Sequence, residues 1–229
     1  MQLGSQYRRL PQGARVAEKE GVKYPSVTTI LSAVYPIIFP EYKLRQYAAR
    51  GWIVHAQIRH FLQTGRWERD LMKIPRTEDE MLRMCRDINI ITSGSLGLSW
   101  EDCNFLGFWE KHGKLFKPWK EKIGEEICFN DQYRYSGTPD WPCLYRDEPA
   151  MVDFKTSMHY PAIRVDKFFK QTAAYAKCEA GGEIKQLVIA PINPGNKCGF
   201  GRPMVDRSVD DYFGWFVRDR RIFNKVYGL

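Results

Sequence analysis

Residues 137–157 read GTPDWPCLYRDEPAMVDFKTS, and this stretch decides the fold. It is rich in residues that favour strands, and the turn-forming residues at 147–149 divide it in two. The preceding stretch, EEICFNDQYRY at 125–135, has the same character and a turn signal at 130–131. We therefore expect three consecutive strands in the second half of the chain.

Other elements are expected on both sides of these strands. Towards the C-terminus we expect a helix over 166–179, a buried strand over 185–192, a short strand after 195 and a helix over 210–227. Towards the N-terminus we expect a hairpin over 14–24, a turn with capping hydroxyls over 25–31, helices over 41–50 and 52–63, and two or three helices within 76–122. Such an order predicts an α/β fold with a central mixed β-sheet flanked by helices.

Two glycines mark expected boundaries. The hairpin is expected to turn at Glu20-Gly21, and Gly65 is expected to end the second helix. The length of 229 residues fits one large domain. We interpret 1–229 as a single domain, with an N-terminal hairpin or arm over 1–24, a mainly helical part over 25–122, and the sheet with the C-terminal helix over 123–229.

The charge balance favours a polyanionic partner. Lysine and arginine number 35 against 27 acidic residues, a net charge of +8. Binding a polyanion releases counterions, although solubility alone also accounts for such a charge. The chain opens without a signal-peptide pattern, and its longest apolar stretch, 33–39, is interrupted by Pro36 and too short to span a membrane. We expect a soluble cytoplasmic protein with no membrane partner.

The six cysteines contain no C-x-x-C pair, so a structural zinc site is not expected. A disulfide framework is also not expected in a chain without a secretory signal. We interpret all six as reduced and mostly buried.

The tripeptide Asp153-Phe154-Lys155 places an acid and an amine on one face of an expected strand. Residues two apart on a strand point to the same side, so Val152 and Phe154 face the opposite side and can join a core. An acid-x-Lys match alone is typical of a solvated strand face. The same pattern also occurs at 41–43 and 183–185.

Asp140 strengthens the functional interpretation. It lies thirteen positions before Asp153, a separation that fits an antiparallel hairpin with the two aspartates side by side. Adjacent carboxylates repel each other unless a cation lies between them, and hard oxygen ligands favour Mg²⁺ or Mn²⁺. Such a metal lowers the pKa of a bound water, and Lys155 can orient or deprotonate that water. These are the groups that phosphodiester hydrolysis requires.

The motifs resemble those of the PD-(D/E)XK nuclease superfamily, above all its RecB-like and phage-exonuclease branches. The resemblance covers about residues 24–190. Its motifs here are Gly137-Thr138-Pro139-Asp140, the run VDFKTS at 152–157, Gln171-x-x-x-Tyr175, Gly51-x-x-x-His55 and an acid upstream of the glycine, Glu126 or Glu125. The run PSVT at 25–28 resembles a segment of the mitochondrial genome-maintenance exonucleases and related phage enzymes.

The resemblance implies a restriction-endonuclease-like core and a role for each matching residue. Asp140 and Asp153 are the implied metal ligands, with the Phe154 carbonyl and His55 completing the set. Lys155 is the implied catalytic lysine, and Glu126 would bind a second metal or position water. Gln171 and Tyr175 would hold the active-site loop or contact the DNA backbone, and Thr156 and Ser157 would orient the strand end.

Two further expectations concern ligands. We prefer Glu126 to Glu125, because Ile127 and Phe129 would then face the opposite side of the strand. Some relatives carry an iron–sulfur cluster on four cysteines near the C-terminus, whereas Cys178 and Cys198 stand alone here, so no cluster is expected. The expected cofactor is Mg²⁺ or Mn²⁺.

The implied function is a metal-dependent DNA exonuclease acting on DNA ends in replication, recombination, repair or DNA degradation, in a phage-like setting. A phage enzyme would act in the cytoplasm of the bacterial host, with a single-strand-binding or recombination protein as a further partner. The alternatives are a structure-specific endonuclease, a catalytically inactive DNA-binding module and a single-strand-binding protein. Either strand polarity, and either single- or double-stranded DNA, fits these residues.

Overall fold

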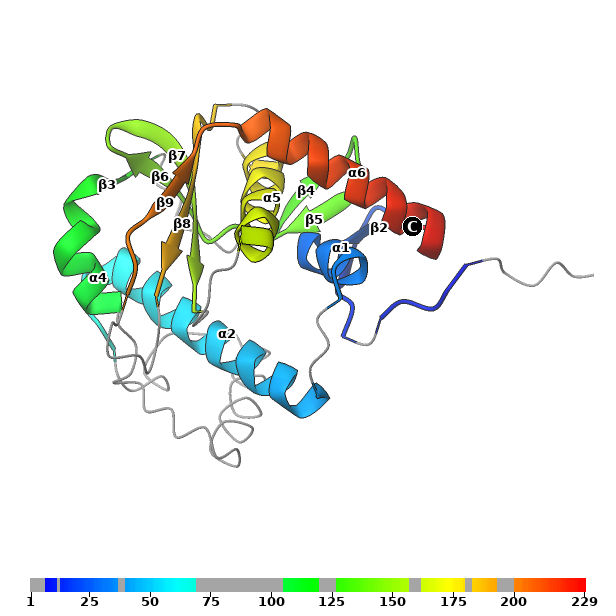
Figure 1. Cartoon of the computed structure of the whole chain (residues 1–229), viewed down its shortest axis with the longest axis horizontal. Coiled ribbons are helices and arrows are strands. Elements are labelled where there is room, and N and C mark those ends of the chain that lie inside the picture. Colours follow the sequence, from blue (N-terminus) through cyan, green and yellow to red (C-terminus); the bar gives the residue numbers. More distant parts are fainter. Residues whose placement is uncertain are drawn as a thin grey trace, which may run out of the picture.

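The computed structural model describes residues 7–11, 13–36, 40–68, 105–119, 127–156, 162–179, 183–192 and 200–229 (Figure 1). The helices are α1 (Val27–Val34), α2 (Glu41–Thr64), α4 (Phe105–His112), the short 3₁₀ helix η3 (Gly113–Leu115), α5 (Ala162–Glu179) and α6 (Val209–Tyr227). The strands are β1 (Val16–Lys19), β2 (Val22–Pro25), β3 (Phe116–Pro118), β4 (Cys128–Asn130), β5 (Tyr135–Gly137), β6 (Trp141–Tyr145), β7 (Glu148–Lys155), β8 (Gln186–Pro191) and β9 (Met204–Asp206).

A mixed sheet forms the centre of the described structure, with five strands in the order β3-β6-β7-β8-β9. Strand β7 is antiparallel to β6 and parallel to β8, and α5 lies between the two parallel strands in the chain (Figure 1). Strand β8 is buried along its whole length, as expected of a strand covered on both faces. The predicted α/β class, with a central mixed sheet and flanking helices, is confirmed.

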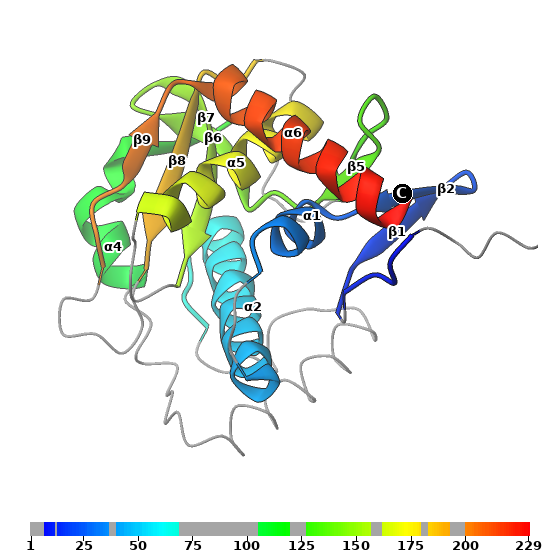
Figure 2. The ribbon, with the colours of Figure 1, turned by 45° about the vertical axis from the view of Figure 1, so that its right-hand side comes forward.

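Alternate residues of β7 face two hydrophobic cores on opposite sides of the sheet. Met151 belongs to the core that includes residues of α1, α5 and α6, whereas Val152 and Phe154 belong to the core that includes residues of α2 and α4. Figure 2 shows α6 lying across α5, with α2 set apart from both. The predicted alternation is confirmed, because Asp153 and Lys155 instead contact Gln171 of α5.

The β6–β7 hairpin turns at Arg146 and Asp147, whose φ angles are 51° and 66°. Two consecutive residues with positive φ are typical of the tight turns that join antiparallel strands. The turn therefore lies slightly before its predicted position at 147–149. The resulting register pairs Trp141 with Val152.

The predicted turn near 130–131 is confirmed: the chain turns between two short strands, β4 and β5, which pair with each other outside the central sheet. Within this turn, Arg134 has a φ of 50° and the Asn130 side chain accepts a hydrogen bond from the Tyr133 amide at 3.0 Å. Asparagine favours such local hydrogen bonds over a continuing ladder. The strands are shorter than predicted, and a break at 138–140 separates β5 from β6.

Two helix boundaries near the N-terminus also differ from prediction. Helix α2 is continuous through Gly51, where two helices were expected, and it ends as predicted at Gly65, whose φ is 70°. A Cβ on Gly51 would lie 3.7 Å from Thr156 Oγ1, an ordinary van der Waals distance, so the end of β7 leaves room for a side-chain carbon at this position. Helix α1 begins within the segment predicted as a turn, because Ser26 caps it by accepting a hydrogen bond from the Thr29 amide.

The remaining predicted elements compare as follows. The hairpin at 14–24 is confirmed as β1 and β2, with Glu20 and Gly21 at positive φ. Helices α5 and α6, strand β8 and the short strand β9 are also confirmed. Within the predicted helical stretch 76–122, residues 76–104 and 120–122 lie outside the described residues, α4 and η3 are helical, and β3 is an unpredicted strand.

No helix in the described segments combines the length and the apolar character needed to cross a membrane. Cys128 and Cys143 are buried and Cys178 is half-buried, and none of the three forms a disulfide with another described residue. Cys85, Cys103 and Cys198 lie outside the described residues.

Candidate active site

The two predicted carboxylates lie at the open end of the β6–β7 hairpin. Asp140 occupies a bend directly before β6, and the pairing of Trp141 with Val152 brings it next to Asp153. The Phe154 amide donates a hydrogen bond of 2.8 Å to Asp140 Oδ2, which fixes the bend against β7. The predicted side-by-side arrangement is therefore present in the structure.

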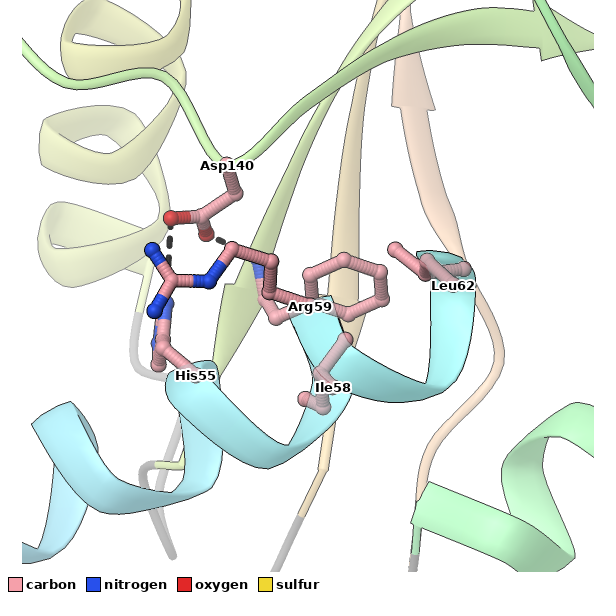
Figure 3. Close-up of a pocket in the computed structure, with 6 residues that line it drawn as sticks. His55, Ile58, Arg59, Leu62 and Asp140 are labelled. Atoms are coloured by element: carbon pink, nitrogen blue, oxygen red, sulfur yellow. Dashed lines mark hydrogen bonds and ion pairs between the residues drawn. The ribbon is translucent and has the colours of Figure 1, made fainter. Parts of the chain in front are cut away.

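Helix α2 contributes His55 to the same place. Its Nδ1 lies 3.0 Å from Asp140 Oδ1, as Figure 3 shows. Burial disfavours the imidazolium, but the neighbouring Asp140 carboxylate outweighs burial and raises the pKa of His55. Burial likewise acts to raise the pKa of Asp140, but His55, Lys155 and the Phe154 amide together lower it.

Asp153 and Lys155 form a buried ion pair that α5 supports. The ammonium Nζ of Lys155 lies 2.8 Å from Asp153 Oδ1 and 3.1 Å from Gln171 Oε1. The Gln171 amide donates to Asp153 Oδ1 at 3.3 Å and to the Tyr175 hydroxyl at 3.1 Å. Gln171 and Tyr175, four residues apart on one helix face, thus connect the core to the ion pair.

The charge state of Asp153 reflects its surroundings. Its side chain is 1% exposed, and burial raises its pKa to about 6; Lys155 opposes this shift and Asp140 reinforces it. Two carboxylates this close disfavour each other's ionisation, so one is held at a raised pKa while the other, Asp140, is held low by His55.

The donor set fits a hard divalent cation. The Oδ2 atom of Asp153 is buried, and the Lys155 ammonium Nζ lies 2.6 Å away from it. Asp140, Asp153, His55 and the Phe154 carbonyl provide oxygen and nitrogen donors, and Mg²⁺ needs one or two carboxylates because water and phosphate fill its remaining positions. Among the described residues, no group of three or more acidic, histidine or cysteine side chains already forms a metal-binding cluster.

A small pocket lies beside the Asp140–His55 pair. Its lining residues come from α2 and from the β6–β7 hairpin: His55, Ile58, Arg59, Leu62, Asp140 and Phe154. Figure 3 shows the Arg59 side chain extending from α2 towards Asp140. Sequence analysis did not select Arg59, although its position four residues after His55 places both on one helix face and could have indicated it.

Three predicted residues, Glu126, its alternative Glu125, and Ser157, lie outside the described residues. The preference for Glu126 assumed that Ile127 and Phe129 lie on the opposite side of the strand from Glu126, and it stays a prediction. Ile127 is 53% exposed. The neighbouring Cys128 is the buried residue, because β4 pairs with β5 and not with the central sheet.

One close contact within the motifs was not predicted. Gly137 of the Gly-Thr-Pro-Asp run lies against the Tyr175 ring, and a Cβ on Gly137 would clash with Tyr175 Cε1. Gly137 is the last residue of strand β5. The contact joins two motifs that are separated by 38 positions in the sequence.

No protein-family model matches the chain, and no curated protein is significantly similar to it in sequence.

Replacing His55 with alanine is expected to weaken Mn²⁺ binding by at least about tenfold. The substitution removes an imidazole that would bind the metal directly or orient the Asp140 carboxylate towards it. Isothermal titration of Mn²⁺ into the two proteins measures this. His60→Ala, on the same helix, is the matched control and should bind like the wild type. Unchanged affinity in His55→Ala would exclude His55 from the metal site.

Proposed function

We propose that the protein is a metal-dependent DNA nuclease with a restriction-endonuclease-like core, and that it acts as an exonuclease on DNA ends. One observation carries the proposal: Asp140 and Asp153 lie side by side at the end of a hairpin, with Lys155 on the same strand face as Asp153. Burying two mutually repelling carboxylates lowers the stability of the folded protein. Their presence therefore favours a role in binding a cation.

The side chains have separate tasks in this proposal. Asp140, Asp153 and His55 would hold Mg²⁺ or Mn²⁺, which would supply an acidified water and shield the phosphate charge. Lys155 orients the attacking water and offsets negative charge on the scissile phosphate. The water gives up one proton as its oxygen bonds to phosphorus, and the bond from phosphorus to the leaving sugar oxygen breaks as that oxygen takes up one proton from solvent.

Helix α5 keeps the lysine in position. Gln171 accepts a hydrogen bond from Lys155 and donates one to Asp153, and Tyr175 accepts another from Gln171. Burial, followed by the charges of Asp153 and Asp140, raises the pKa of Tyr175, so its hydroxyl stays protonated and neutral. A neutral, buried anchor of this kind fixes the direction of Lys155 without competing for the metal.

The exonuclease assignment rests on two supports of different kinds. The motif set resembles that of exonuclease branches, and the net charge of +8 favours a polyanion. We place the protein in the cytoplasm, where a DNA substrate is accessible. If a phage encodes the chain, this is the cytoplasm of the bacterial host.

The direct test uses DNA labelled at the 5′ or the 3′ end, single- or double-stranded, incubated with Mg²⁺ or with EDTA. We expect degradation that requires the metal, with early release of the label from one end. Early products of intermediate length would instead show an endonuclease. Binding without cleavage in both Mg²⁺ and Mn²⁺ would contradict the nuclease proposal and support a DNA-binding module.

A further inference from the structure

Helix α5 continues past Gln171 towards its N-terminal end, and the next residue on the same face is Lys167. Residues four apart lie one above the other on a helix, separated by about 6 Å along its axis. Phe168, next to Lys167, has its ring 4.8 Å from Lys155 Nζ. Lys167 is therefore one helical turn beyond the group that supports the catalytic lysine.

Two lysines of this helix have contrasting partners. Lys170 has a full set, with its Nζ 3.0 Å from Asp219 Oδ2, 2.6 Å from the Tyr35 hydroxyl and 4.6 Å from the centre of the Tyr35 ring. Lys167 donates one long hydrogen bond, of 3.4 Å, to the Tyr35 carbonyl oxygen. A carbonyl satisfies a donor but does not neutralise its charge.

The charged groups that act on Lys167 have the same sign as its own. Its side chain is half-buried, and burial, followed by the charges of Lys155 and Arg164, lowers its pKa to about 8. Among the described carboxylates, Asp219 pairs with Lys170 and Asp153 pairs with Lys155. Lys167 therefore places a positive charge one helical turn from Gln171, beside the candidate site.

We propose that Lys167 binds a backbone phosphate of the nucleic-acid strand, next to the phosphate that is cleaved. The inference rests on the proposed nuclease function and names the group that holds the strand beside the reacting bond. The step of one helical turn between Gln171 and Lys167 is comparable with the distance between successive phosphates along a strand. A bound phosphate would supply the counter-charge for Lys167, and it would also offset the repulsion from Lys155 and Arg164.

The competing role for Lys167 is purely structural. Tyr35 is the C-terminal cap of α1, and a lysine near the end of a helix stabilises the last carbonyl groups. This role predicts a loss of thermal stability in a variant, with DNA binding unaffected. The phosphate role predicts the opposite pattern, so the two are separable by experiment.

The test measures binding of a fluorescent 20-nucleotide DNA in EDTA across a series of NaCl concentrations, for wild type, Lys167→Gln and Lys167→Arg. Loss of one phosphate contact should reduce the slope of log affinity against log salt by about 0.7 to 0.9, whatever the DNA sequence. We expect Lys167→Gln to bind about tenfold more weakly at low salt. Lys167→Arg, which keeps the charge, should retain the wild-type slope.

Lys177→Gln is the matched control, because Lys177 lies on the same helix but pairs with Asp210 at 2.6 Å, ten residues from Lys167. It should keep the wild-type slope. An unchanged slope in Lys167→Gln overturns the inference, even if the wild type cleaves DNA. A reduced slope in a protein that cleaves no DNA supports Lys167 as a phosphate ligand but contradicts the nuclease proposal, whereas a wild type that neither binds nor cleaves DNA contradicts both.

Discussion

The Asp153→Asn variant is expected to lose DNA cleavage by a factor of about a thousand or more in kcat/KM while remaining folded. An amide of the same shape is a weak ligand for Mg²⁺, and the metal contributes several kcal/mol to the transition state at about 1.36 kcal/mol for each tenfold in rate. Single-turnover cleavage of end-labelled DNA in saturating Mg²⁺ measures the loss. Asp131→Asn is the matched control, because Asp131 is exposed and pairs with Lys19 on the N-terminal hairpin.

The same variant should be at least as stable as the wild type in EDTA at pH 8. Burial raises the pKa of Asp153 to about 6 in the folded protein. A carboxyl group with a raised pKa binds its proton more tightly when folded, so metal-free stability falls as the pH rises from about 4 to about 6. The amide cannot ionise and avoids this fall. Thermal melts from pH 4 to pH 8 test the expectation, and a variant that melts well below the wild type at pH 8 would contradict it.

Opposite effects on activity and stability separate a functional carboxylate from a structural one. A buried aspartate that serves only an ion pair destabilises the protein when it is replaced, because its lysine is left unpaired. If the Asp153–Lys155 pair were structural, Asp153→Asn would therefore lower the melting temperature and leave binding of Mn²⁺ unchanged. The proposal requires the reverse on both counts.

The strand-face alternation of 152–155 was readable from the sequence, because a strand repeats every two residues and apolar residues alternate with Asp153 and Lys155. The hairpin was readable as well, since thirteen positions and a turn signal fix an antiparallel pair. The contact of His55 with Asp140 joins residues 85 positions apart, and the resemblance alone indicated it. Local patterns do not encode which helix covers which end of a sheet.

Two differences from prediction show the limits of local patterns. Gly51 suggested a break between two helices, because glycine is unfavourable within a helix by about 1 kcal/mol. In the structure α2 continues through Gly51, so one unfavourable residue does not end a helix of 24 residues. The turn signal at 130–131 was readable, but it did not indicate that β4 and β5 pair with each other outside the central sheet.

Gly137 is a glycine whose role depends on a distant contact. A Cβ there would clash with Tyr175 Cε1 and would lie 2.7 Å from its Cδ1, closer than packed atoms approach. The Tyr175 ring is 5% exposed and its hydroxyl is held by Gln171, so the ring has little freedom to move aside. Any displacement of Tyr175 passes to Gln171 and from there to Lys155.

Gly137→Ala is accordingly expected to lower kcat about a hundredfold and to reduce the free energy of unfolding by about 1–3 kcal/mol. Overpacking a filled core costs energy of this size, and a misplacement of about 1 Å in a catalytic group costs about a hundredfold in rate. Thermal melting and single-turnover cleavage measure the two effects. Gly214→Ala is the control: a Cβ on this glycine of α6 meets no atom within 4 Å, so the variant should gain up to about 1 kcal/mol in stability.

A double variant separates the contact from the glycine itself. Tyr175→Leu removes the ring atoms that the new Cβ would strike, so Gly137→Ala should cost less stability in that background than in the wild type. Cleavage should not recover, because leucine provides no hydroxyl for Gln171. Additive losses of stability would show that the ring is not what Gly137 accommodates. Recovery of cleavage in the double variant would show that Lys155 is positioned without Tyr175, and the chain of contacts from Gly137 to the catalytic lysine would then have no functional role.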